Sequence, residues 1–185
     1  MPIQTDRFLI RKMTSTDHPA YLQLVESESG IQITNDAQFQ SIFLSRSSEN
    51  TLILSLLTVP DNHYIGYVAI KHIDTTVPEL GISLLPNYQG HGIGVEALQL
   101  AAREYAAAHP VDHYLLRVKG YNRASQRTME KLGAYRLEDE GDLMLEELKR
   151  MTAEIGTEES HKILEEYLQT YDAEQENVLR YRYDI

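Results

Sequence analysis

Three apolar stretches follow one another at residues 51–59, 63–73 and 79–85, with no helical pattern between them. Turn residues separate them, because Pro60 opens the first interval and Pro78 closes the second. Consecutive strands with short turns predict an antiparallel meander, which a fold of alternating parallel strands and helices does not contain. The meander therefore limits the fold to those that keep several antiparallel strands in sequence order.

The patterns on either side of the meander alternate between strands and helices. A strand is expected over 8–13, helices over 14–27 and 35–50, a helix over 94–110, a strand over 113–120, a helix over 122–133, and strands over 134–140 and 177–185. The order predicts an α+β fold, with one domain over residues 1–185 and a mixed central sheet of about six to seven strands with flanking helices.

An acidic segment lies between the last two expected strands. Residues 141–174 hold ten Asp and Glu against three Lys and Arg, or 3 − 10 = −7 of the chain's net charge of −11. Apolar residues recur at helical spacing on both sides of Gly156. The segment therefore predicts a helical hairpin inserted where a tight turn would serve.

Composition excludes several classes of function. The chain has no cysteine, which rules out disulfides, thiolate metal sites and a cysteine nucleophile. Its net charge of −11 disfavours nucleic-acid binding. It has no run of about 18 apolar residues and no export signal at residues 1–12, so no membrane partner and a cytoplasmic location are expected. The sequence HPVDH at 109–113 is interpreted as a turn, and no metal is predicted.

Three alternate glycines, Gly90, Gly92 and Gly94, separate the third strand of the meander from the alanine-rich helix. Glycine removes the side chain, so free amides at the start of a helix can converge on an anion that the helix dipole also attracts. The stretch therefore predicts pyrophosphate binding, with a plain turn as the alternative. A plain turn needs one glycine, whereas three cost up to ~1 kcal/mol each in chain entropy.

Two better-known phosphate motifs fit poorly. Residues 92–97 satisfy G-x-G-x-x-A, but the strand that follows the helix ends in Lys119, where a dinucleotide fold has an acidic residue. No G-K-[ST] follows the glycines, which excludes a P-loop. The anion site is therefore expected outside a dinucleotide-binding or P-loop fold.

Two motifs resemble the GNAT superfamily of acetyl-CoA-dependent N-acetyltransferases. Residues 89–94 (QGHGIG) match the family pattern Q/R-x-x-G-x-G/A, and residues 122–125 (NRAS) with 130–133 (EKLG) match a second family element. The start of the chain (5–17) and residues 79–92 resemble the branch that contains the ribosomal-protein N-terminal (alanine or serine) acetyltransferases. The resemblance covers roughly residues 5 to 140 and implies a GNAT-like domain.

The resemblance also implies which residues bind acetyl-CoA as cosubstrate. The amides from Gly90 to Val95 would hold the diphosphate, the main chain of Ile82 to Leu84 would pair with the pantetheine arm, and Asn122 with Ser125 would flank that arm. For Asn122 a simple helix cap is the alternative. The expected coenzyme-binding residues are Ile82, Leu84, Gln89, Gly90, His91, Gly92, Ile93, Gly94, Val95, Asn122 and Ser125.

Catalytic roles follow from the same resemblance. Glu79 matches the position of a catalytic glutamate in many relatives and is expected to act as a base through water, with a solvated edge-strand carboxylate as the alternative. The amide of Ile82 would polarise the thioester carbonyl. Many relatives protonate the leaving thiolate with a tyrosine, and Met129 stands at that position here. The candidates that remain are Ser125, Tyr121 and water, and Ser125 is preferred.

The expected reaction moves an acetyl group to a primary amine, on a protein N-terminus or a small molecule. The hairpin over 141–174 could cover the acceptor site, attract a cation, pack against a second subunit in a homodimer, or serve as a structural flap. An alternative of a different class is a non-catalytic acyl-CoA-binding or interaction module, which the missing tyrosine allows.

Overall fold

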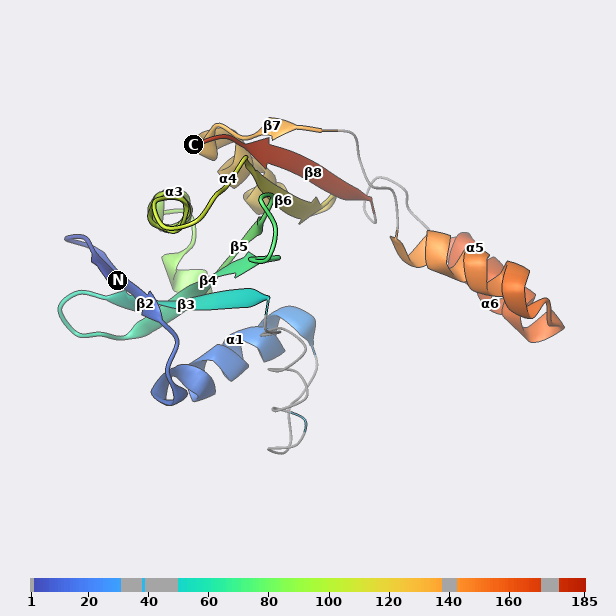
Figure 1. Ribbon diagram of the computed structural model, residues 1–185. Helices are drawn as coiled ribbons and strands as arrows, with labels where there is room; N and C mark the ends of the chain where they lie inside the picture. The colour runs from blue at the N-terminus through green and yellow to red at the C-terminus, as the bar shows by residue number, and fades with distance from the viewer. Residues whose placement is uncertain (1, 31–37, 39–49, 138–142, 171–176) are drawn as a thin grey trace. The chain divides into compact units, whose positions relative to one another are not determined.

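The structure, a computed structural model, describes residues 2–30, 38, 50–137, 143–170 and 177–185 (Figure 1). One mixed sheet has the strand order β1-β2-β3-β4-β5-β6-β8-β7. Its strands are β1 (Ile3–Gln4), β2 (Phe8–Lys12), β3 (Thr51–Thr58), β4 (Tyr64–Lys71), β5 (Glu79–Leu84), β6 (Tyr114–Lys119), β7 (Tyr135–Arg136) and β8 (Val178–Tyr183). The α+β prediction is confirmed, and the sheet exceeds the expected size because the two-residue β1 pairs with β2.

The described helices agree with the sequence patterns. They are α1 (His18–Ser29), α3 (Ile93–Ala106), α4 (Arg123–Leu132), α5 (Leu143–Ile155) and α6 (Glu158–Thr170), with short 3-10 turns η1 (Ser15–Asp17) and η2 (Pro86–Tyr88). The helix expected over 35–50 lies almost wholly outside the described residues. The strand expected over 134–140 is described only as far as residue 137, and its regular part is β7.

The chain divides into two compact units, Met1–Leu116 with Tyr183–Ile185, and Arg117–Arg182. In the first unit, β2 to β5 pair antiparallel in sequence order, which confirms the meander. β5 then pairs with β6 in parallel, in the register Glu79 to Leu115. The pairing therefore changes from antiparallel to parallel at β5, the strand that leads into the glycine stretch.

Helices α1 and α3 cover opposite faces of the sheet in the first unit (Figure 1). Side chains alternate along a strand, so Ile82 and Leu84 point to one face and Ser83 to the other. The first two contact the start of α3 at Gly94, whereas Ser83 Oγ bonds to Glu28 of α1. The buried core includes Phe8, Ile10, Leu24, Val25, Leu56, Ile65, Val68, Ile70, Leu98 and Leu116.

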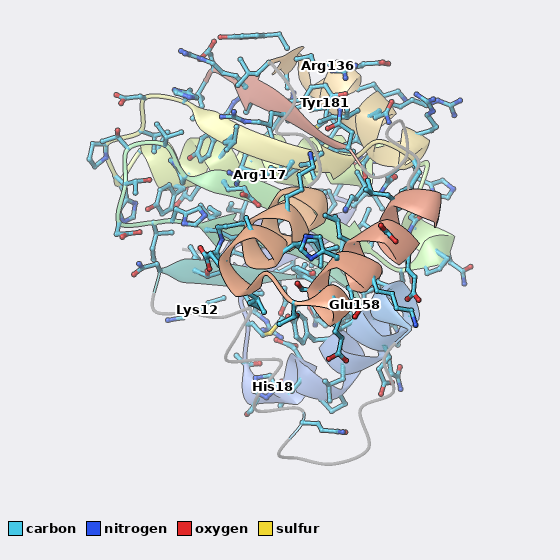
Figure 2. All side chains as sticks on the ribbon, turned by 90° about the vertical axis from the view of Figure 1, so that its right-hand side faces the viewer. Lys12, His18, Arg117, Arg136, Glu158 and Tyr181 are labelled. Atoms are coloured by element: carbon cyan, nitrogen blue, oxygen red, sulfur yellow. The ribbon has the colours of Figure 1, made fainter. Side chains whose placement is uncertain are left out.

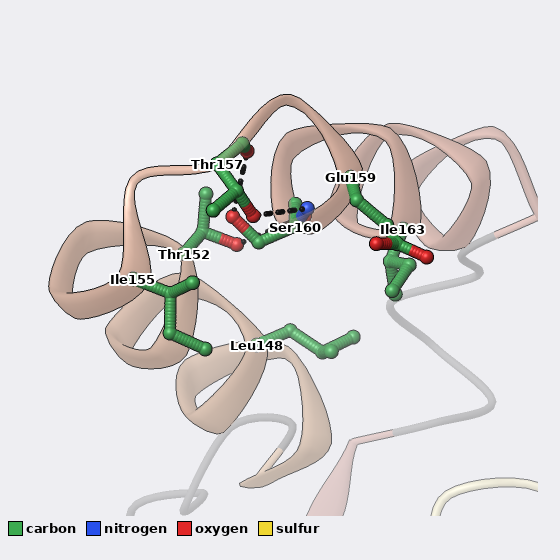
Figure 3. Close-up of a pocket in the computed structure, with 7 residues that line it drawn as sticks. All are labelled: Leu148, Thr152, Ile155, Thr157, Glu159, Ser160 and Ile163. Carbon is green, nitrogen blue, oxygen red and sulfur yellow. Dashed lines mark hydrogen bonds between the residues drawn. The ribbon is translucent and has the colours of Figure 1, made fainter.

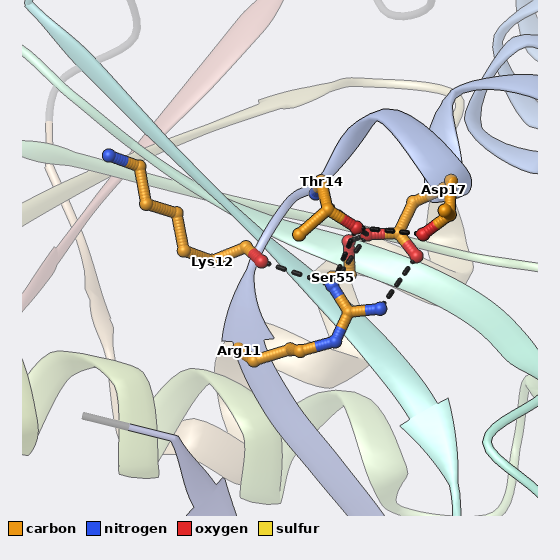
Figure 4. Close-up of polar contacts among 6 residues, drawn as sticks. Arg11, Lys12, Thr14, Asp17 and Ser55 are labelled. Atoms are coloured by element: carbon orange, nitrogen blue, oxygen red, sulfur yellow. Dashed lines mark hydrogen bonds and ion pairs between the residues drawn. The ribbon is translucent and has the colours of Figure 1, made fainter.

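A buried carboxylate fixes the start of α1 (Figure 4). Arg11 of β2 holds Asp17 with both guanidinium ends, at 2.6 Å to Oδ2 and 2.8 Å to Oδ1. The Thr14 amide and the Ser55 hydroxyl donate to the same carboxylate, each at 2.9 Å. Burial alone would raise the pKa of Asp17, but the bonds from Arg11, Thr14 and Ser55 outweigh it and lower the pKa to about 2. This cluster anchors α1 to β2 and β3.

The second unit contains α4, β7 and the hairpin of α5 and α6. Arg136 of β7 lies opposite Tyr181 of β8 (Figure 2). The two hairpin helices contact each other, and Gly156 ends α5 with a φ of +63°. The Thr157 hydroxyl then accepts a bond of 3.2 Å from the Ser160 amide, so it caps the first turn of α6.

Candidate active site

The glycine turn presents bare backbone at the start of α3. Gly90 and Gly92 have φ of +79° and +78°, a conformation that side chains disfavour, and no described atom lies within 4 Å of an ideal Cβ at either. Gly92 is the N-cap, and the first helical bond runs from the Glu96 amide to its carbonyl at 3.2 Å. The amides of Ile93 to Val95 precede that bond, so the helix itself leaves them without an acceptor.

The third glycine brings α3 close to β5. A Cβ on Gly94 would lie 3.7 Å from both Ile82 Cδ1 and Leu84 Cδ1, an ordinary packing distance. Gln89 ties the turn to the same strand, because its Nε2 donates to the Leu84 carbonyl at 2.8 Å. The predicted coenzyme residues on β5 and in the turn are therefore brought together, and the exposed Gln89 side chain joins them through this bond.

The main chain of β5 has one side turned away from β4. The Leu85 amide donates to the Ile65 carbonyl in β4. Main-chain N–H and C=O groups alternate in direction along a strand, so those of Glu79, Gly81 and Ser83 point toward β4, and those of Leu80, Ile82 and Leu84 point toward β6. The parallel register between β5 and β6 consists of the pair Glu79 and Leu115. The Ile82 main-chain groups and the Leu84 amide therefore point toward the side where an extended ligand could pair as an added strand.

Glu79 is buried and paired. Its side chain is 9% exposed, and its Oε1 lies 2.8 Å from Nζ of Lys71, its register partner on β4. β5 is an interior strand, so Glu79 is not the solvated edge carboxylate of the alternative interpretation. By alternation its side chain lies on the α1 face with Ser83, opposite to Ile82 and Leu84.

The α1 face of β4 and β5 carries further polar groups that the sequence analysis did not single out. Ser83 is 8% exposed, and its hydroxyl bonds to the exposed Glu28 near the end of α1. The rings of Tyr21 and Tyr67 meet edge to face at 5.2 Å. Burial raises the pKa of Tyr64, and the neighbouring Tyr67 and Tyr21 add to the rise, so this phenol stays neutral. The face combines neutral hydroxyls with the carboxylates of Glu28 and Glu79.

Asn122 and Ser125 lie in the second unit, at the start of α4. Asn122 Oδ1 accepts the Ser125 amide at 3.0 Å, which confirms the cap. The Ser125 side chain is half-buried. Met129 is 3% exposed and Tyr121 is 60% exposed. The cap and a coenzyme contact are compatible, because the cap uses the Asn122 oxygen and leaves its amide nitrogen available.

The hairpin carries a small, open apolar pocket of its own (Figure 3). The Thr152 hydroxyl donates to the Ser160 carbonyl at 3.2 Å and so links α5 to the first turn of α6. Ile155, Ile163 and Leu168 remain 54%, 50% and 46% exposed. The pocket is lined by Leu148, Thr152, Ile155, Thr157, Glu159, Ser160 and Ile163. The role of the hairpin stays a prediction.

The family model for the acetyltransferase (GNAT) domain matches residues 7–135. The chain belongs to the GNAT acetyltransferase family. The matched region contains the meander, the glycine turn, α3 and α4. This GNAT protein is therefore an acetyltransferase that uses acetyl-CoA, as the two motifs predict. No curated protein sequence matches the chain.

Several solved structures share the fold of this GNAT protein. The ribosomal L7/L12 alpha-N-protein acetyltransferase RimL in complex with coenzyme A has 14% identity and a TM-score of 0.69, over 100% of this chain and 98% of that one. Spermidine N-acetyltransferase from Vibrio cholerae with CoA and spermine has 11% identity and a TM-score of 0.67, over 97% and 96%. The ribosomal-protein-S5-alanine acetyltransferase from Vibrio fischeri has 13% identity and a TM-score of 0.66, over 98% and 95%.

Two properties of the described residues bear on partners. No helix there combines the length and apolar character needed to cross a membrane. In the same part of the chain, no group of three or more His, Asp or Glu residues is arranged to hold a metal ion. His109, in the segment interpreted as a turn, stacks on Tyr105 with ring centroids 4.1 Å apart.

Proposed function

We propose that this GNAT protein transfers the acetyl group of acetyl-CoA to a primary amine, on a protein N-terminus or a small molecule. One observation carries the proposal. The glycine turn, with φ near +79° at Gly90 and Gly92, leads directly into α3 beside the main-chain groups of β5 that point away from β4. A turn of bare amides next to strand main-chain groups that point away from β4 suits a ligand with a diphosphate and an extended amide-containing arm.

The coenzyme would be held mainly by main-chain groups. The amides from Gly90 to Val95 would bind the diphosphate, and Ile82 with the Leu84 amide would pair with the pantetheine arm. The Leu84 carbonyl already accepts the Gln89 side chain, so we assign Gln89 to shaping the turn and not to direct contact. Asn122 and Ser125 keep the flanking role that the family motif implies.

The chemistry needs a neutral amine and a polarised carbonyl, and bound acetyl-CoA supplies the activated thioester. An alkyl amine has a pKa near ~10, so a base must take its proton. Glu79 would do so through water, with Lys71 holding one carboxylate oxygen at 2.8 Å. The Ile82 amide would donate to the thioester oxygen, and Ser125 would relay a proton from water to the leaving thiolate, because Met129 has none to give.

The acceptor would approach from the α1 face of β5. Glu79, Ser83 and Glu28 all lie on this face, and the carboxylate of Glu28 would attract a protonated amine. The coenzyme turn packs on the opposite face, at Ile82 and Leu84. The two substrates would therefore meet at β5 from its two sides.

A thiol-release assay tests the proposal. Purified protein is mixed with acetyl-CoA and a panel of amines: a polyamine, an aminoglycoside, and peptides that begin with alanine or serine. Matched peptides with a blocked N-terminus are the control, because they lack the nucleophile. Thiol release with free amines alone would support the transferase. Coenzyme binding without release on any amine would instead indicate the non-catalytic acyl-CoA-binding module.

A further inference from the structure

Arg7 connects the beginning of the chain to the glycine turn. It lies between β1 and β2. There the Thr5 hydroxyl accepts hydrogen bonds from the Arg7 amide at 3.1 Å and from the Phe8 amide at 3.0 Å. Its Nη1 donates to the His91 carbonyl at 3.0 Å, and its Nη2 pairs with Glu96 Oε2. One guanidinium therefore bonds both the middle of the turn and the first turn of α3.

The bond to His91 sets the direction of the Gly92 amide. A trans peptide is planar, with its carbonyl and its N–H pointing in opposite directions. Because Arg7 holds the His91 carbonyl, the N–H of Gly92 points away from Arg7. Glycine accepts either sign of φ, so nothing in Gly92 itself prevents this peptide from turning over. Arg7 favours one of the two orientations.

The bond to Glu96 removes an unfavourable charge. Glu96 lies in the first turn of α3, next to the amides that would bind the diphosphate. An unpaired carboxylate there would repel an anionic ligand, and the side chain is 32% exposed, so water would screen it only in part. The Arg7 guanidinium offsets that charge without occupying the amides.

We propose that Arg7 is a positioning residue for the coenzyme: it orients the Gly92 amide and neutralises Glu96 without contacting the ligand. This inference rests on the proposed function, because it assigns the anion at the turn to coenzyme A. The side chains of Arg7 and Glu96 are 43% and 32% exposed, so substitutions at either position are compatible with folding.

Calorimetric titration with coenzyme A and with dephospho-coenzyme A tests the proposal. Arg7→Ala should weaken the binding of both ligands by about tenfold, the effect of one partly screened charge at short range. The double variant Arg7→Ala/Glu96→Gln should bind both ligands about threefold more tightly than Arg7→Ala, since the repelling carboxylate is then gone. Arg103→Ala is the matched control, because Arg103 is exposed in the last turn of α3 and its loss changes the net charge equally.

Three results would overturn the proposal: unchanged binding in Arg7→Ala, a loss that Glu96→Gln does not recover, or a loss confined to the ligand with the 3′-phosphate. The last would make Arg7 a direct phosphate ligand. Arg7→Lys keeps the charge without the two-ended contact, and it should fall between the wild type and Arg7→Ala. Wild-type protein that binds neither ligand would refute the proposed function itself, and so separates the two failures.

Discussion

Lys71 and Glu79 face each other across β4 and β5, with Nζ of Lys71 2.8 Å from Oε1 of Glu79. The lysine side chain is 45% exposed and the glutamate side chain is 9% exposed, so the carboxylate is the buried member of the pair. The pair accounts for one oxygen of Glu79. A base in this position must act with a lysine already on its carboxylate, which favours proton transfer through water.

Glu79→Gln should lower kcat by about a hundredfold or more, the contribution of a positioned general base. The affinity for acetyl-CoA should stay unchanged, because the glycine turn proposed to bind the coenzyme lies on the other face of β5. Steady-state kinetics with the best amine of the panel measures both. Glu104→Gln, on the exposed side of α3, is the charge-matched control. Equal kcat in the wild type and Glu79→Gln would remove Glu79 from the mechanism.

Gly92→Ala should weaken coenzyme binding by about tenfold, since an alanine at φ of +78° costs about 1–2 kcal/mol. Gly133→Ala is the matched control. Gly133 has φ of +82° at the end of α4, with the same open space around an added Cβ. Both variants should lose similar stability in urea, whereas calorimetry should show weaker binding only for Gly92→Ala. An equal loss of coenzyme affinity in both would contradict the role of the turn.

Asp17→Asn should destabilise the protein in a pH-dependent way. The pKa of Asp17 is lowered from 3.8 to about 2, so the charged carboxylate stabilises the fold fully above pH 4 and loses this effect as the pH falls through 2. The loss in Asp17→Asn should be about 2 kcal/mol at pH 7 and should shrink toward pH 2. Urea unfolding at several pH values measures it, with the exposed Asp61→Asn as control. A pH-independent difference would argue against this cause.

Glu28→Gln should raise the KM for the amine several-fold and leave the KM for acetyl-CoA unchanged, because Glu28 lies on the α1 face. Ser83→Ala, which removes the bond that orients Glu28, should act in the same direction with a smaller effect. The KM of each substrate is measured with the other saturating. Higher salt should narrow the difference in the KM for the amine between the wild type and Glu28→Gln, since salt screens an exposed carboxylate. An effect on acetyl-CoA instead would place the acceptor elsewhere.

Local patterns were sufficient to predict the glycine turn. Glycine spacing and the alanine-rich helix are properties of neighbouring residues, and Gly92 and α3 follow directly from them. The pair of Lys71 and Glu79 did not follow from the strand ends. The second strand of the meander was expected to run to residue 73, whereas β4 ends at Lys71, so the expected ends give a different register.

Other parts of the site depend on contacts between distant segments. Arg7 lies 84 positions before His91, and Ser83 lies 55 positions after Glu28. No sequence period connects such pairs, and only the packed sheet brings them together. Gln89 illustrates the same limit, because the motif indicates its position but not that its amide is engaged by the Leu84 carbonyl.

The cluster around Asp17 has a mechanical consequence for the acceptor face. Asp17 is fixed at one end of α1, and Glu28 lies eleven positions further on, about 16 Å along the axis. A tilt of α1 by about 5° about its fixed N-terminal end would therefore displace Glu28 by about 1.4 Å. Substitutions at Arg11 or Ser55 would therefore shift Glu28 and, with it, the proposed binding position of the amine.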